Sequence, residues 1–200
     1  RSSDLFYHTY KDGQAQYEAF LDDLAFLIEA LLAVHRITFD TTYLHLAREV
    51  ARQVRDQYYD DDSGLFFYTA ATQQDILLRK KELYDSAVPS GNSTMAHNLL
   101  QLAAFFDDGD SRETALRMLS TLKDSIEKYP SSFGNWARAT LHLSKPGYEI
   151  AVVGDDAEAM AAGVNRYYLP NAIVMAADRG DEHYPLLAGK TGGAHSKIYV

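Results

Sequence analysis

The feature that most constrains this chain is a helix-forming segment that is apolar on nearly every face. Over residues 20–37, large apolar side chains recur at spacings of three and four residues, which predicts an α-helix. Phenylalanine, alanine and valine fill most of its other faces. Such a helix is usually enclosed by other helices. The sequence therefore predicts a helical core built around residues 20–37.

The helices that follow alternate between enclosed and two-sided ones. A second helix, running to about Tyr58, has an apolar stripe and a charged stripe, which is typical of an outer helix. Further helices are predicted over 93–106 and 111–128, and a fifth begins near Ser131. Inner and outer helices joined in antiparallel hairpins are typical of an α/α toroid. In a toroid, the first, third and fifth helices run parallel, so their N-termini lie at the same end.

The pattern changes near residue 146. Residues 1–145 are expected to form the helical hairpins of a partial toroid, with a short β-hairpin near 65–79 that pairs 65–69 with 76–79. Residues 146–200 are expected to form a small β-α-β unit. The expected fold class is mostly α, followed by a small α/β unit.

Within the second unit, strands are predicted over 149–154 and 171–176, around a short helix over 156–164. Residues 195–200 are a third candidate strand. The chain starts without Met and stops in an apolar, strand-like run. We therefore expect a fragment of a longer chain, truncated within this last unit.

Charge and composition exclude several classes of function. The chain has 19 basic and 28 acidic residues, a net charge of −9, which disfavours nucleic acids and anionic membranes as partners. It contains no cysteine, which excludes disulfide scaffolds and thiol catalysis. The sequence shows neither a signal peptide nor an apolar run long enough to span a membrane. We expect an acidic, soluble, cytoplasmic protein.

The seven histidines predict no metal site. They form neither a His-x-His nor a His-Glu-x-x-His arrangement. Gly189-Lys190-Thr191 is similar to the end of a phosphate-binding P-loop, but Tyr184 stands where that motif needs glycine. We therefore reject nucleotide-phosphate chemistry and expect no cofactor.

Unusual polar residues gather where the inner helices begin. Asp22 and Asp23 open the first of them, and a polar loop containing Asp85 opens the third. Free N–H groups and the positive end of the helix dipole attract carboxylates there. One explanation of Asp22 and Asp23 is that they stabilise the N-terminal end of their helix. The alternative is sugar chemistry, with Asp23 and Asp85 as a catalytic carboxyl pair and Asp22 as a substrate contact.

Five further residues are candidates for contact with a substrate, and each also has a structural explanation. Ser90 and Asn92 are good helix caps, but they also hydrogen-bond well to sugar hydroxyls. Tyr84 and Trp136 are suited either to stacking on a sugar ring or to packing in the core. His97 lies early in the third helix, where it points into a cavity or forms a buried hydrogen bond.

Three segments resemble one protein family: residues 10–13 (YKDG), 19–25 (AFLDDLA) and 83–93 (LYDSAVPSGNS). The chain resembles the spermatogenesis-associated thioredoxin-like proteins and their bacterial relatives over nearly its whole length. The resemblance implies a thioredoxin-like domain that precedes an α/α toroid. The chain departs from the family pattern at Leu24, where the family has Tyr, and at Ser86, where it has Gly. The Leu24 difference removes a hydroxyl near Asp23.

The resemblance leaves two functional hypotheses open. The family's toroid looks like those of six-hairpin glycosidases and N-acylglucosamine 2-epimerases, which implies that it binds or processes a carbohydrate. This hypothesis predicts an acidic, aromatic-lined cavity at the N-terminal end of the inner helices. The alternative is a non-catalytic scaffold or partner-binding module attached to the thioredoxin-like region. It predicts that the same polar residues serve as caps, with no open cleft.

Overall fold

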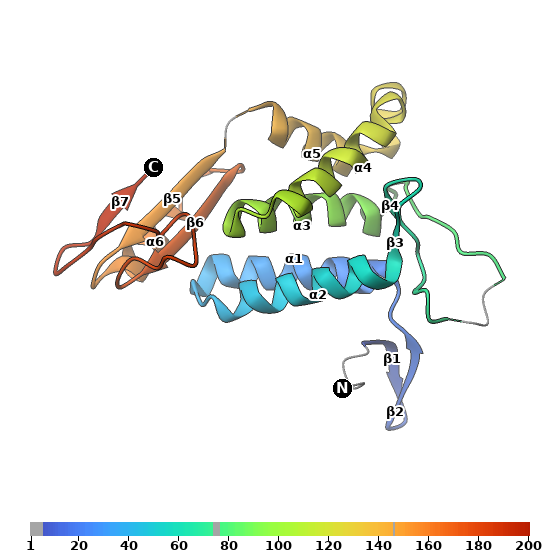
Figure 1. Ribbon diagram of the computed structural model, residues 1–200, viewed down its shortest axis with the longest axis horizontal. Helices are drawn as coiled ribbons and strands as arrows, with labels where there is room; N and C mark the ends of the chain where they lie inside the picture. The colour runs from blue at the N-terminus through green and yellow to red at the C-terminus, as the bar shows by residue number, and fades with distance from the viewer. Residues whose placement is uncertain (1–5, 74–76, 146) are drawn as a thin grey trace.

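The computed structural model describes residues 6–73, 77–145 and 147–200. These residues form a mostly helical body and a small α/β unit, as the sequence predicted (Figure 1). Their helices are α1 (Leu21–Thr38), α2 (Thr42–Tyr58), α3 (Gly91–Phe106), α4 (Gly109–Lys128), the 3₁₀ turn η1 (Pro130–Ser132), α5 (Gly134–Ser144) and α6 (Ala157–Val164). Their strands are β1 (Tyr7–Lys11), β2 (Gln14–Glu18), β3 (Tyr59–Asp60), β4 (Leu65–Phe66), β5 (Tyr148–Val153), β6 (Ala172–Ala177) and β7 (Lys197–Tyr199). In this part of the chain, every helix is too short or too polar to cross a membrane.

The helices of the body alternate in direction. Figure 1 shows α1, α3 and α5 running one way, with α2 and α4 returning in the opposite sense. The first nine residues of α3, 91–99, are all buried, so α3 is the central helix. The predicted parallel arrangement of these three helices, with their N-termini at the same end, is confirmed. Within the described ranges, these helices form antiparallel hairpins and do not close into a ring.

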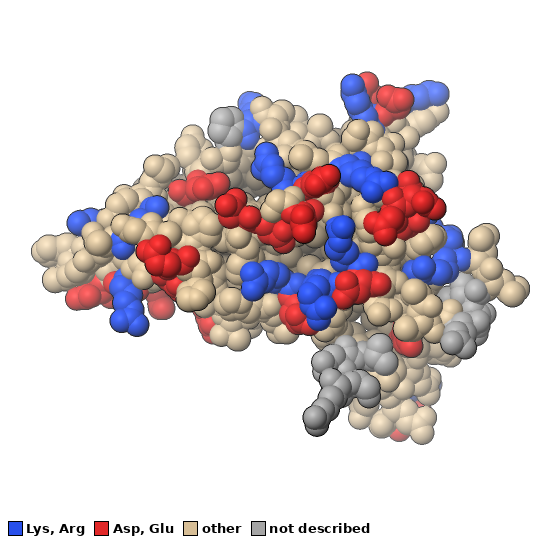
Figure 2. All heavy atoms as spheres, in the orientation of Figure 1, with Lys and Arg blue, Asp and Glu red and all other residues tan. Residues whose placement is uncertain are grey.

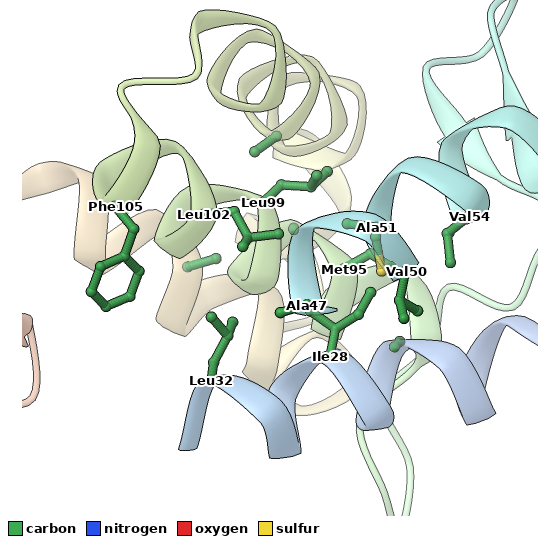
Figure 3. Packing of buried hydrophobic residues seen from close by; sticks show 14 of the residues in the cluster. Ile28, Leu32, Ala47, Val50, Ala51, Val54, Met95, Leu99, Leu102 and Phe105 are labelled. Carbon is green, nitrogen blue, oxygen red and sulfur yellow. The ribbon is translucent and has the colours of Figure 1, made fainter. Parts of the chain in front are cut away.

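The core lies between α1, α2 and α3, where apolar side chains interdigitate (Figure 3). Ile28 of α1 and Met95 of α3 are fully buried, and Val50 of α2 is 1% exposed. Burying a side chain of this size stabilises the fold by about 1.5–3 kcal/mol. The outer face of α2 is charged, with Arg52 bridging Glu49 and Asp56. Figure 2 shows acidic and basic groups mixed on the visible face of the molecule.

A β-hairpin, β1–β2, precedes the first helix and projects from the body (Figure 1). Its tight turn is Asp12-Gly13, where both residues have positive φ angles, a conformation that glycine adopts readily. Every residue of β1 is exposed. A backbone hydrogen bond from Ala19 N–H to the Phe6 carbonyl closes the base of the hairpin, and the Tyr58 hydroxyl of α2 donates to the Ala19 carbonyl. No strand was predicted for these residues.

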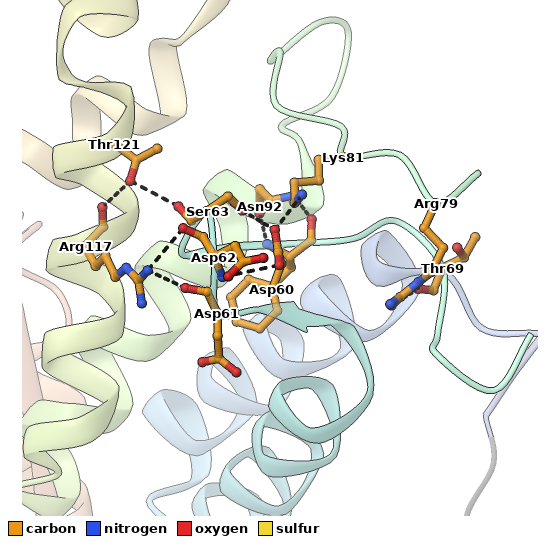
Figure 4. Close-up of polar contacts among 11 residues, drawn as sticks. Asp60, Asp61, Asp62, Ser63, Thr69, Arg79, Lys81, Asn92, Arg117 and Thr121 are labelled. Atoms are coloured by element: carbon orange, nitrogen blue, oxygen red, sulfur yellow. Dashed lines mark hydrogen bonds and ion pairs between the residues drawn. The ribbon is translucent and has the colours of Figure 1, made fainter.

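The expected hairpin between 65–69 and 76–79 is corrected by the structure. Strand β4 instead pairs with β3, so 65–66 lie against 59–60; residue 76 falls outside the described residues. The reason is the turn between β3 and β4, where Gly64 has a φ of 72° and the Asp60 carboxylate accepts a hydrogen bond from Ser63. Lys81 forms an ion pair with Asp60, and Arg117 of α4 donates to the Asp61 carbonyl (Figure 4). Closing such a short loop costs little chain entropy, so the nearest strand becomes the partner.

The α/β unit packs on the helical body and shares its core. Strands β5 and β6 are parallel and joined through α6, and β7 pairs antiparallel with β5. Alternate residues of β5 face opposite sides. Ala151 and Val153 join the core of the helical body, whereas Ile150 and Val152 pack with α6. The predicted β-α-β unit is therefore present.

The loop after β6 explains why Gly189-Lys190-Thr191 does not form a P-loop. Tyr184 is 2% exposed, and its hydroxyl lies 2.8 Å from Nε2 of His45 on α2. The tyrosine therefore anchors this loop to the helical body. The Gly189 N–H donates to the Glu182 carboxylate of the same loop.

Candidate carboxylate site at the helix N-termini

Asp22 joins the start of α1 to the start of α3. Its Oδ1 accepts a hydrogen bond of 2.9 Å from the Gly91 N–H, the first residue of α3. A side chain at position 91 would collide with this carboxylate, so glycine allows the close approach. Burial raises the pKa of Asp22, as do the negative charges of Asp23 and Glu82, while the Gly91 N–H acts against them. Asp22 is thus a half-buried carboxyl group that holds its proton more tightly than usual.

Asp85 joins the starts of α3 and α5. Its Oδ1 accepts hydrogen bonds from the Ser90 N–H at 3.0 Å and from the Ser93 hydroxyl at 2.7 Å. Its Oδ2 accepts one from the Asn135 N–H at 2.8 Å. The Asn135 side-chain amide also donates to the Ser93 hydroxyl. Both oxygens of Asp85 are therefore used to hold two helix N-termini together.

Ser90 and Asn92 have different structural roles. Ser90 is the N-cap of α3, and its hydroxyl accepts a hydrogen bond from the Ser93 N–H. Asn92 is fully buried and bonds to strand β4, accepting from the Phe66 N–H and donating to the Phe66 carbonyl. Its side-chain amide also donates to the Glu82 carbonyl. The capping role expected at Ser90 is confirmed, whereas Asn92 holds the β4 segment to α3.

Asp23 is partly exposed and lies beside the base of the hairpin. Its Oδ2 accepts a hydrogen bond of 2.9 Å from the Phe20 N–H, which caps α1. The same oxygen lies 2.8 Å from Nδ1 of His8 on β1. In the part of the chain that the structure describes, no donor reaches the second oxygen of Asp23 or of Asp22. These two oxygens differ from those of Asp85, which are both occupied.

Two aromatic rings stand beside these carboxylates. Phe20 and Tyr68 stack with their centroids 4.8 Å apart and their planes 17° apart. The pKa of the Tyr68 hydroxyl is raised, first by burial and then by the charges of Asp22, Asp23 and Glu82. The Leu21 N–H donates to the Tyr68 carbonyl, which places Tyr68 next to the start of α1, where Asp22 and Asp23 lie.

The sequence did not single out Phe20, Tyr68, Glu82 or His8. Phe20 was considered only as the first residue of the expected helix and as part of the motif at residues 19–25. Tyr68 and Glu82 lie outside the helices, where no periodic pattern reveals a residue's neighbours. The quoted family motifs combine aromatic and acidic residues, which was the one feature of the sequence that pointed to such a cluster. Of these four residues, only Phe20 lies in one of the motifs.

The remaining predicted contacts lie in different environments. Tyr84 is 68% exposed and packs against Phe133, so its ring remains accessible. Trp136 is completely buried, and its Nε1–H donates to the Leu83 carbonyl. His97 is 6% exposed, and its Nε2 lies 2.9 Å from the Asn135 carbonyl. Trp136 therefore contacts the loop before α3 from its buried side, and His97 contacts the start of α5 in the same way.

His97 is expected to make the fold sensitive to mild acid. Burial, and after it the nearby Arg138 charge, lower the pKa of His97 to about 4. Between pH 6.5, the ordinary pKa of a histidine, and about pH 4, the unfolded chain binds a proton that the folded chain excludes. Stability is therefore lost as pH falls through this window. Urea midpoints at pH 7 and pH 5 should differ less in His97→Gln than in the wild type. His183→Gln, at a highly exposed histidine, should leave the difference unchanged; an equal loss in wild type and His97→Gln would contradict this assignment.

The described residues contain no cluster of three or more His, Asp or Glu side chains placed to hold a metal ion. Among the cavities of the described chain are five of about 170–430 Å³, and none of these five is lined by Asp22, Asp23 or Asp85. The acidic, aromatic-lined cavity expected at the N-terminal end of the inner helices is therefore not one of them. One lies between β2 and α2, and another between α3, α5 and the start of β5.

Comparison with known proteins shows homology over most of this chain. No protein-family model matches the sequence. The chain is 28% identical to spermatogenesis-associated protein 20 of Rattus norvegicus over 165 residues, and 27% identical to that of Homo sapiens over 164, each alignment covering 80% of this chain. An uncharacterized protein of Caenorhabditis elegans is 26% identical over 169 residues. The chain spans about a fifth of the length of these relatives, 21–23%. It is thus homologous to one part of spermatogenesis-associated protein 20.

Proposed function

We propose that the N-terminal end of α1, α3 and α5 binds a carbohydrate, as part of a toroid-like helical body. The observation that carries the proposal is the placement of Asp22 and Asp23 beside the stacked rings of Phe20 and Tyr68. Aromatic faces pack on the apolar face of a sugar ring, and a few fixed polar groups orient its hydroxyls.

The hydrogen bonds at this end divide the acidic residues into two roles. Asp22 and Asp23 each have one oxygen fixed by a backbone N–H, and the second oxygen is the one assigned to the ligand. The raised pKa of Asp22 suits a proton donor to a sugar oxygen. Asp85, predicted from the sequence as the catalytic partner of Asp23, is assigned here to positioning the α3 and α5 starts.

The resemblance to a family whose members carry a thioredoxin-like domain before the toroid extends the proposal to a longer chain. In that arrangement, the helical body accompanies a thioredoxin-like region and further hairpins complete the ring. The homologous relatives are about five times longer than the matched segment, which accommodates such additions.

One observation favours a second candidate, a non-catalytic scaffold. The Asp85 carboxylate and the polar groups of Ser90 and Asn92 are taken up by helix ends and by β4. If Asp22 and Asp23 serve only in the same way, this end of the molecule holds helices together and binds no sugar.

A binding experiment separates the two candidates. Saturation-transfer NMR with neutral sugars (glucose, mannose, N-acetylglucosamine, N-acetylmannosamine, maltose and cellobiose) should detect a bound sugar in the wild type. Asp22→Asn and Asp23→Asn each keep an oxygen for the backbone N–H but replace the second oxygen, the one assigned to the ligand, with an NH₂ group. We expect about tenfold weaker binding, equivalent to about 1.4 kcal/mol.

The matched control is Asp124→Asn, at an exposed carboxylate on α4, which should bind as the wild type does. Circular dichroism of each variant checks that it remains folded. Absence of binding by the wild type at about 10 mM sugar, or equal binding by all variants, would favour the scaffold.

A further inference from the structure

His8, on the projecting hairpin, contacts the candidate site through Asp23. Its Nδ1 lies 2.8 Å from Asp23 Oδ2, although the two residues are 15 positions apart. Their side chains are 42% and 34% exposed, so the pair lies at the surface. We propose that His8 Nε2 accepts a hydrogen bond from a ligand hydroxyl and that Asp23 is the residue that positions His8. This inference rests on the proposed carbohydrate-binding function.

The contact with Asp23 determines which imidazole nitrogen faces the ligand. An ionised carboxylate only accepts hydrogen bonds, so the Nδ1 atom facing Asp23 must carry the hydrogen. In the neutral ring, Nε2 then has a free lone pair. Among the described residues, none forms a hydrogen bond with this Nε2. The pair therefore presents an oriented acceptor to solvent at the edge of the site.

A second contact restrains the His8 ring. Its centroid lies 4.8 Å from that of Phe20, with the planes tilted by 55°. Phe20 in turn stacks on Tyr68. Because one side of the ring is held by Asp23 and another by Phe20, the direction of Nε2 is set by α1 and does not depend on the hairpin alone.

The chain contains a second His–Asp pair that lacks these features. His183 Nδ1 lies 2.8 Å from Asp181 Oδ1, the same distance as in the first pair. However, the two residues are only two positions apart, and the His183 side chain is 88% exposed. No aromatic ring among the described residues packs on His183. This pair is therefore a matched control for a His–Asp contact outside the candidate site.

The charges around His8 restrict the chemical class of the ligand. His8 contacts Asp23, which follows Asp22 in α1, and Glu18 of β2 pairs with Tyr7, the residue before His8. The charge of Glu82, in the loop before α3, acts on Asp22 and Tyr68. Lys80 forms an ion pair with Glu82 and offsets one of these charges. The remaining negative charge repels sugar phosphates and uronic acids. The inferred ligand is therefore a neutral sugar or an amino sugar.

Protection from diethyl pyrocarbonate tests the contact directly, because this reagent modifies an unprotonated imidazole nitrogen. The tightest-binding sugar of the panel above is added before the reagent, and modification of each histidine is read by mass spectrometry. We expect the sugar to slow modification of His8 several-fold and to leave the rate at His183 unchanged.

Two substitutions test the roles of the pair. His8→Phe keeps an aromatic ring against Phe20 but removes Nε2, so binding should weaken about tenfold, whereas His183→Phe should bind like the wild type. In Asp23→Ala, Nδ1 loses its acceptor, and the hydrogen returns to Nε2, the nitrogen that carries it in most free neutral histidine rings. Nitrogen-15 NMR of the histidine rings should show this change of tautomer at His8 and none at His183.

The outcomes separate this inference from the proposed function. Sugar binding with His8 unprotected, and equal affinity in His8→Phe, would overturn the role of His8 and leave the carbohydrate proposal intact. Absence of sugar binding by the wild type would overturn both. Protection of His8 together with the loss in His8→Phe would establish the inference.

Discussion

Replacing Asp85 with asparagine is expected to lower the free energy of unfolding by about 2–4 kcal/mol, as befits the loss of charge-assisted hydrogen bonds. The carboxylate accepts three hydrogen bonds, from the Ser90 N–H, the Ser93 hydroxyl and the Asn135 N–H. Asparagine offers one oxygen, and its NH₂ group would face a donor. One of the two helix N-termini therefore loses its acceptor.

Urea unfolding measures this change, with the fluorescence of Trp136 as the probe. Trp136 is the single tryptophan of the chain, and it lies in α5, whose start Asp85 holds. Asp124→Asn serves again as the control and should change stability by less than about 0.5 kcal/mol. A change of that small size in Asp85→Asn would show that Asp85 does not join the two helices.

Replacing Asn92 with aspartate is expected to cost about 3–5 kcal/mol, the cost typical of an uncompensated buried charge. Asn92 is fully buried, and its NH₂ group donates to the carbonyls of Phe66 and Glu82. A carboxylate of nearly the same shape would face these two carbonyl oxygens. It would add charge repulsion to the loss of two donors.

Asn92→Ala is the informative comparison because it removes more atoms but adds no charge. It should cost about 2–3 kcal/mol, as expected for buried partners left without hydrogen bonds. Thermal or urea unfolding of both variants gives the order. If alanine cost more than aspartate, the contribution of Asn92 would come from packing, and its hydrogen bonds to β4 would not matter.

The helical body could be predicted from the sequence because its signal is local. The apolar spacing in α1 and the two-sided pattern of α2 each determine a helix without knowledge of the partner. The same reasoning placed Asp22, Asp23 and Asp85 together, because helices that run parallel bring their N-termini to one end. The contacts from Asp22 to Gly91 and from Asp85 to Asn135 confirm that placement.

Other parts of the site depend on contacts that the sequence does not show. His8 meets Asp23 because a hairpin folds back on α1, and a two-stranded hairpin gives a weak pattern. The pairing of β4 was misassigned because both strands are two residues long, and the side-chain contacts of Asp60 and Arg117 decide the turn. Trp136 was a candidate for stacking, but a buried tryptophan and an exposed one look alike in a sequence.

The most direct test of the account is a titration of the labelled protein with the neutral sugars, followed by the backbone amide shifts. We expect saturable shifts at residues 20–24, at Tyr68 and at Gly91, where the free carboxylate oxygens and the stacked rings meet. Shifts confined to another place, such as the cavity between α3, α5 and β5, would contradict the location of the site. Absence of shifts at any residue would contradict carbohydrate binding itself and leave the helix N-termini with a purely structural role.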